Sequence, residues 1–89
     1  MGVPIPREVI PNFGEPGDRL TVKIIGDVLS EATRCSFGNG ILTGVPRVIS
    51  DGELRVKLEI LPDASLGWRD AVVTNTSGDG TLRKGFEVI

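Results

Sequence analysis

The chain has 89 residues, including 12 Asp or Glu and 10 Lys or Arg, and its formal net charge is −2. This length allows one domain and is too short for two. The small negative charge gives no general attraction to a nucleic-acid backbone or to an anionic membrane surface. No apolar run is long enough to span a bilayer. The first residues lack the basic and apolar regions of a signal peptide.

The 12 glycines and 6 prolines fall between short apolar runs. This pattern favours many short strands joined by tight turns. Residues 7–10 lie between Pro6 and Pro11, and proline cannot donate to a sheet ladder. We therefore predict an edge strand, or an extended lead-in strand, at 7–10. Residues 12–18 are rich in turn formers and predict a turn, whereas residues 19–25 alternate and predict a second strand.

The middle of the chain gives weaker signals. Residues 27–31 are ambiguous and could hold a helical turn. Residues 33–37 predict a strand with Cys35 and Phe37 facing inward. The Gly-Asn-Gly run at 38–40 is typical of a hairpin, because Asn and Gly tolerate the left-handed backbone that such turns need. Short strands are predicted at 41–43 and 45–49.

The clearest element is Glu53–Ile60, with the sequence ELRVKLEI. Its apolar residues are Leu54, Val56, Leu58 and Ile60, and the residues between them are Arg55, Lys57 and Glu59. A period of two gives a strand with one buried and one charged face, whereas a helix would mix the two sets. The mixed-sign charges predict a solvated face rather than a ligand surface. The preceding Asp51 and Gly52 predict a two-residue hairpin turn.

The last third follows the same logic. The sequence predicts a crossover at 62–67, a strand at 69–74, a turn at 75–80 and the last strand at 82–88. About seven strands, with turn signals every 8–12 residues, favour an antiparallel β-sandwich. No helix of useful length is predicted, so the fold class is all-β.

Several landmarks also carry a family resemblance. They are Ile-Pro-Asn at 10–12, Gly-Glu-Pro-Gly-Asp at 14–18, Leu-Thr-Val through to Gly26, Cys-Ser-Phe-Gly at 35–38, Leu-Gly at 66–67, the run 70–75 and the close at 82–88. In order and spacing these resemble IPT/TIG domains, immunoglobulin-like folds of plexins, Rel-type transcription factors and many bacterial surface and secreted proteins. The resemblance covers nearly the whole chain. Val28 and Leu29 stand where the family often has an aromatic, and Ala71 where a larger apolar residue is usual.

The resemblance implies one immunoglobulin-like domain over residues 1–89, excised from a larger protein that is extracellular or on the cell surface. We expect a non-catalytic structural or interaction module that contacts neighbouring domains or other proteins. The alternative is an accessory polysaccharide-binding module of a secreted carbohydrate-active enzyme. A DNA-contacting role, known for the Rel-type relatives, needs basic loops, and the Lys and Arg residues here are scattered. We therefore expect neither nucleic-acid binding nor membrane insertion. Fold alone does not choose between the structural role and the accessory role.

Two residues are candidates for an interaction surface. Trp68 is the only tryptophan, and the chain has no tyrosine. If Ala71 and Val73 face the core, alternation turns Val72 outward, with Trp68 at the same parity. An exposed Trp68–Val72 patch would suit a neighbouring domain. Two other interpretations stay open: Trp68 folds over the end of the core, or it stacks on a sugar, although a sugar platform usually needs several exposed aromatics.

No catalytic, cofactor-binding or metal-binding residue is predicted. The single Cys35 has no disulfide partner and no histidine to activate it, so we expect a small buried hydrophobe. The aspartates do not have the spacing of a calcium loop; they are Asp51, Asp63, Asp70 and Asp79. Residues 75–77 match a glycosylation acceptor, and we interpret this match as accidental.

Overall fold

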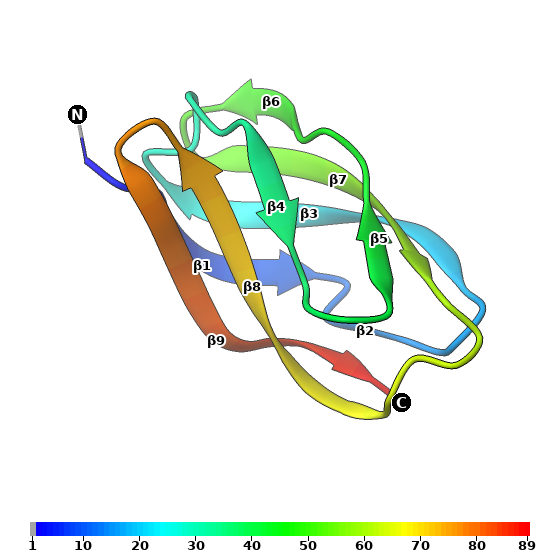
Figure 1. Cartoon of the computed structure of the whole chain (residues 1–89). Coiled ribbons are helices and arrows are strands. Elements are labelled where there is room, and N and C mark those ends of the chain that lie inside the picture. The colour runs from blue at the N-terminus through cyan, green and yellow to red at the C-terminus, as the bar shows by residue number, and fades with distance from the viewer. Residues whose placement is uncertain (1) are drawn as a thin grey trace.

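The computed structural model describes residues 2–89, so Met1 of the predicted domain lies outside the described residues. The all-β prediction is confirmed, because nine strands and no helix form within this range. They build two sheets (Figure 1). The strands are β1 (Ile5–Ile10), β2 (Phe13–Gly14), β3 (Arg19–Asp27), β4 (Arg34–Ser36), β5 (Ile41–Thr43), β6 (Arg47–Ser50), β7 (Glu53–Ile60), β8 (Gly67–Asn75) and β9 (Gly78–Val88).

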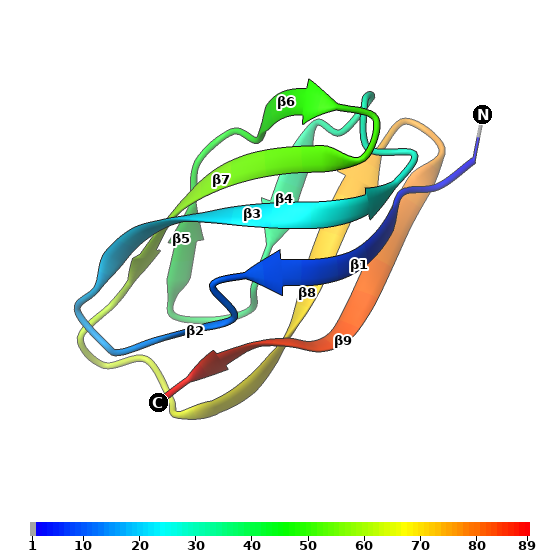
Figure 2. The ribbon, with the colours of Figure 1, turned by 180° about the vertical axis from the view of Figure 1, so that it is seen from behind.

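The first sheet has the order β1-β3-β7-β5, with β6 also paired to β7, and the second has the order β2-β9-β8-β4. Strand β1 lies at an edge, as the prolines around it predict. Figure 2 shows β1, β3 and β7 side by side in front of the second sheet. The pairs are antiparallel except β2 with β9, which is parallel. The antiparallel prediction is therefore wrong for this one pair.

Strand β7 is the centre of the first sheet, and its alternation is confirmed. The apolar residues from Leu54 to Ile60 are all buried, whereas Arg55 and Lys57 are exposed. Val22 and Ile24 of β3 lie opposite Val56 and Leu54 of β7, so the inner rows of the two strands match residue for residue. Cross-strand pairs of this kind stabilise a sheet. The two-residue turn at Asp51 and Gly52 then leads β6 back into β7.

The core joins side chains of both sheets into one buried cluster. Phe37 follows β4 and meets Phe86 of β9 edge to face, with ring centroids 5.5 Å apart. Cys35 is buried in the same cluster, as predicted, and burial raises the pKa of its thiol to about 12. A thiol in this state is neutral at physiological pH, so Cys35 packs as a small hydrophobic residue.

The strand count and two turns differ from the sequence predictions. The nine strands exceed the expected seven partly because β2 lies inside the predicted turn at 12–18. A strand of only two residues is too short to show an alternating pattern in the sequence. Strand β2 is held in place by hydrogen bonds from Glu87 N to Asn12 O and from Ile89 N to Gly14 O. The run at 38–40 is not a hairpin, because β4 and β5 belong to different sheets. The ambiguous segment at 27–31 contains no helix, but it begins a single tight turn that is closed by a hydrogen bond from Ala32 N to Leu29 O.

The molecule is elongated, with principal extents of 37 × 20 × 18 Å. Strand β1 begins at one end of it and β9 stops toward the other, as Figures 1 and 2 both show. The turn between β8 and β9 lies at the first end and the loop between β2 and β3 at the second. The long axis therefore runs between the two places where the chain enters and leaves the fold.

Candidate interaction surface

Trp68 lies on the outer face of the second sheet, where 49% of it is exposed. It therefore does not fold over the end of the core. The register places Trp68 of β8 opposite Glu87 of β9, and Phe13 of β2 opposite the same Glu87. Residues paired in register point to the same side of a sheet. Phe13, Glu87 and Trp68 thus form one row across three strands, which we call the aromatic–carboxylate row.

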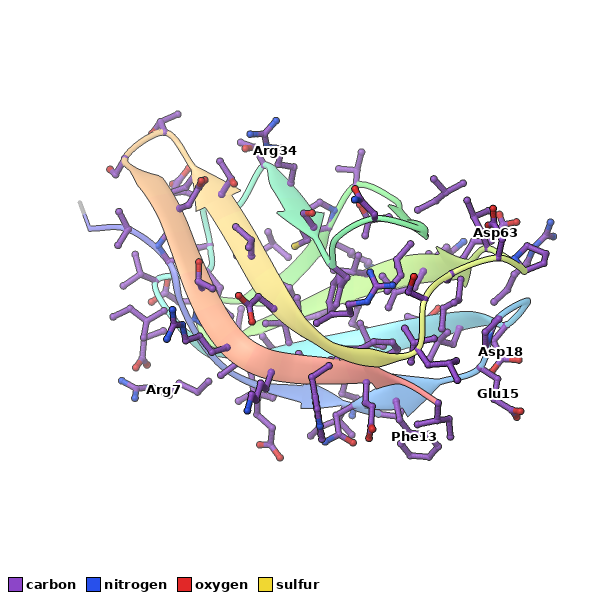
Figure 3. The ribbon with its side chains drawn as sticks, turned by 60° about the horizontal axis from the view of Figure 1, so that its bottom comes forward. Arg7, Phe13, Glu15, Asp18, Arg34 and Asp63 are labelled. Atoms are coloured by element: carbon purple, nitrogen blue, oxygen red, sulfur yellow. The ribbon has the colours of Figure 1, made fainter. Side chains whose placement is uncertain are left out.

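The fold of β2 explains how Phe13 reaches this row. Gly14 faces the core, and a Cβ there would stand 2.7 Å from Cδ1 of Ile60. Glycine lets β2 lie close against the core, and alternation then turns Phe13 outward. Phe13 is 53% exposed, and in Figure 3 its ring points away from the body of the molecule beside the end of β9.

The row has an apolar margin on its side toward the end of the chain. Ile89 is 48% exposed, and alternation from Glu87 through the buried Val88 places it on the outer face. Leu66, which is also exposed, precedes β8 two residues before Trp68. Adjacent strands lie about 4.8 Å apart, so the backbones that carry Phe13 and Trp68 are roughly 10 Å apart. Two large rings therefore flank one carboxylate on an open surface.

The Glu87 carboxylate has no partner of its own. The described ion pairs join Arg7 to Asp27, Arg19 to Glu59 and Arg55 to Glu53. Within residues 2–89, no ion pair or side-chain hydrogen bond reaches the carboxylate of Glu87. Glu87 is half-buried between the two rings. The row consequently holds a negative charge that the described chain does not neutralise.

The second candidate, Val72, is half-buried on β8 opposite Ser36 and Thr81. It lies four positions after Trp68 along the strand, a distance of roughly 13 Å. The strands shift register between the two positions, and the carboxylate of Asp70 accepts a hydrogen bond from the backbone N–H of Lys84 at this bulge. Trp68 is therefore grouped with Phe13 and Glu87 rather than with Val72. Sequence reasoning missed both new members.

Arg69 is a further residue without a sequence signal. It lies opposite the buried Phe86, and its guanidinium donates hydrogen bonds to the carbonyl oxygens of Phe37, Asn39 and Ser65. These contacts tie the loop after β4 to the loop before β8. Because the guanidinium is bound there, it does not serve as the cation for the neighbouring aromatic–carboxylate row.

Asn75 and Asp51, which the sequence analysis considered as glycosylation and calcium candidates, have partners within the fold. Asn75 is 4% exposed, and its amide contacts Gly2 O, Ser77 N and Gly78 N, so the sequon asparagine is not on the surface. Hydrogen bonds from the hydroxyl and N–H of Ser30 lower the pKa of Asp51. The described residues contain no group of three or more His, Cys, Asp or Glu side chains placed to hold a metal ion. They also contain no helix that could cross a membrane.

Comparisons with known proteins add no family to these observations. No protein-family model matches the sequence, and no curated protein matches it either. The resemblance to IPT/TIG domains therefore stays a prediction, and the geometry of the surface is the basis for a functional proposal.

Proposed function

We propose that the chain is an immunoglobulin-like β-sandwich of the IPT/TIG type that acts as a non-catalytic spacer and protein-contact module of a larger surface or secreted protein. The strand order supports this fold. The series β1-β3-β7-β6 corresponds to the A-B-E-D sheet of an immunoglobulin domain, and β9-β8-β4 to its G-F-C sheet. Strands β2 and β5, of two and three residues, are then additions to the usual seven.

The spacer role rests on the shape of the molecule. Its long dimension of 37 Å is about twice either of the others, and the chain enters and leaves toward opposite ends. Neighbouring domains joined at these places would be held apart along the long axis. The apolar core that links the two sheets supports rigidity, because interiors of this kind are closely packed.

Spin-label distances test the spacer role. Thr76→Cys lies in the turn between β8 and β9 and Glu15→Cys in the loop between β2 and β3, at opposite ends of the molecule (Figures 1 and 3). The buried Cys35, with its raised pKa, should stay unlabelled. We expect a single narrow distance distribution that broadens only when urea unfolds the chain. A broad or two-peaked distribution in the native protein would reject the rigid spacer.

The second candidate function is polysaccharide binding beside a catalytic domain. The observation that favours it is the presence of two exposed aromatic rings, Phe13 and Trp68, on one face of the second sheet. A glycan array checks this function directly. Micromolar binding that disappears in Trp68→Ala would favour it over the protein-contact role.

A further inference from the structure

We propose that the aromatic–carboxylate row of Phe13, Glu87 and Trp68 binds a cationic side chain, an arginine in the first place, presented by a partner protein. This inference rests on the proposed contact role and adds the chemistry of the partner. The row is a set of three neighbouring side chains fixed by strand register, rather than a chance grouping of mobile loops.

The geometry suits a planar cation. Aromatic faces attract cations through their negative quadrupole, and a carboxylate accepts two parallel hydrogen bonds from a guanidinium. Here the backbones that carry the two rings are roughly 10 Å apart with the carboxylate position midway between them. A guanidinium placed over Glu87 would therefore have an aromatic ring on each side. Arginine combines stacking with bidentate bonding, whereas lysine offers a compact point charge.

The negative charge of Glu87 favours a cationic ligand over a neutral one. A partner that covers the row removes water from the Glu87 carboxylate, which is costly unless a cation or strong donors replace that water. The described chain supplies no such cation, since the guanidinium of the neighbouring Arg69 is bound to loop carbonyls. A partner arginine would supply both the charge and the donors. The hydroxyl groups of a neutral sugar would supply donors without the charge.

A second copy of the chain fits the row less well. Two copies related by a twofold axis through the row would present the same patch to each other. That arrangement would place one Glu87 carboxylate close to the other, and like charges in contact oppose association. The charge therefore favours a partner of opposite sign over self-association.

The test uses the single tryptophan as a reporter. The probe is an acetylated and amidated pentapeptide of alternating glycine and arginine, titrated into labelled protein while the Trp68 indole and Glu87 amide signals are followed by NMR. The control peptide carries citrulline, which keeps the shape of arginine without its charge. We expect the arginine peptide to shift both signals and the citrulline peptide to bind at least about tenfold more weakly, because exposed cation–π and charge contacts together are of that size.

Two protein variants complete the experiment. Glu87→Gln should lower affinity for the arginine peptide about tenfold, the size of a lost exposed charge pair and its hydrogen bonds. Glu59→Gln is the matched control. Glu59 is also half-buried, but it belongs to the first sheet, where it pairs with Arg19. It should bind as the unchanged protein does. Unfolding in urea checks that both variants are folded.

Three outcomes would overturn the inference. They are equal binding of the arginine and citrulline peptides, an unchanged affinity in Glu87→Gln, and signal shifts at the row with cellohexaose but not with the arginine peptide. The last outcome would assign the row to polysaccharide instead. The peptide titration tests only the arginine site, and the spin-label distances test only the spacer role. A failure of one proposal can therefore be told apart from a failure of the other.

Discussion

The carbonyl oxygen of Pro4 occupies the space that a side chain at Gly80 would need. The same segment crowds Gly26, where a Cβ would overlap the carbonyl oxygen of Ile5. Gly80 belongs to β9 of the second sheet and Gly26 to β3 of the first. The first strand therefore runs along the boundary between the sheets, and two glycines give its backbone room to do so (Figure 2).

This close approach makes Gly80→Ala destabilising. The added methyl group must push the backbone of Pro4, just before β1, away from β9, and overpacking of this kind costs about 1–3 kcal/mol. Gly44→Ala is the matched control, since the nearest atom to a Cβ there is 3.7 Å away, and it should stay within about 0.5 kcal/mol. Urea unfolding of the two variants measures the difference. Equal midpoints would show that the first strand does not press on β9.

The two faces of β7 predict opposite sensitivities to mutation. Leu58 is 3% exposed, whereas Lys57 next to it points into solvent. Leu58→Ala should lower the free energy of unfolding by about 2–5 kcal/mol, because it removes buried methyl groups and leaves a cavity. Lys57→Ala should change it by less than about 0.5 kcal/mol. Chemical denaturation compares them, and similar losses would mean that the faces are assigned wrongly.

Elements with a long apolar alternation could be predicted from the sequence. The alternation in β7 predicts its observed bounds, since eight residues of period two leave one choice of buried face. Shorter elements carry less information. The glycines at positions 38 and 40 do adopt positive φ, as a hairpin predicts, but the chain uses the turn to cross between sheets. Local backbone preference does not encode which sheet a strand joins.

The aromatic–carboxylate row could be predicted only in part. Parity alone placed Trp68 on the outer face, and that placement is observed. Its neighbours depend on pairing between residue 13 and residue 87, which are 74 positions apart and belong to a two-residue strand and a long one. No periodicity spans such a distance. Phe13 also lies among turn-forming residues, so nothing in its surroundings marked it as part of a sheet.

The Arg69 guanidinium should contribute to stability by joining two loops. Arg69→Ala removes hydrogen bonds to Phe37, Asn39 and Ser65. Charged donors of this kind contribute about 1.5–3 kcal/mol when their partners lose water, so we expect a loss of about 2 kcal/mol. Arg34→Ala on the exposed side of β4 is the control and should stay within about 0.5 kcal/mol. Equal melting temperatures for the two variants would show that the Arg69 hydrogen bonds to the loops do not stabilise the fold.

Because the Cys35 thiol is buried, we expect the free energy of unfolding to fall at alkaline pH. Burial raises the pKa of this thiol to about 12 in the folded chain, from the ordinary value of 9.0 that we expect once unfolding exposes the thiol. Below pH 9 both states hold the proton, so the thiol gives no pH dependence. Between pH 9 and 12 the unfolded state loses the proton while the folded state keeps it, and stability must fall as pH rises. At pH 10 the loss from this one group is on the order of 1 kcal/mol.

Cys35→Ala isolates that contribution. The variant loses a buried sulfur, and this cost does not depend on pH. Urea unfolding at pH 8 and at pH 10 should therefore show a steeper loss in the unchanged protein than in the variant, with other titrating groups common to both. The native thiol should also resist iodoacetamide at pH 8 and react once urea exposes it, because only the thiolate attacks. Parallel pH profiles for the two proteins would show that Cys35 ionises as readily in the folded state as in the unfolded one.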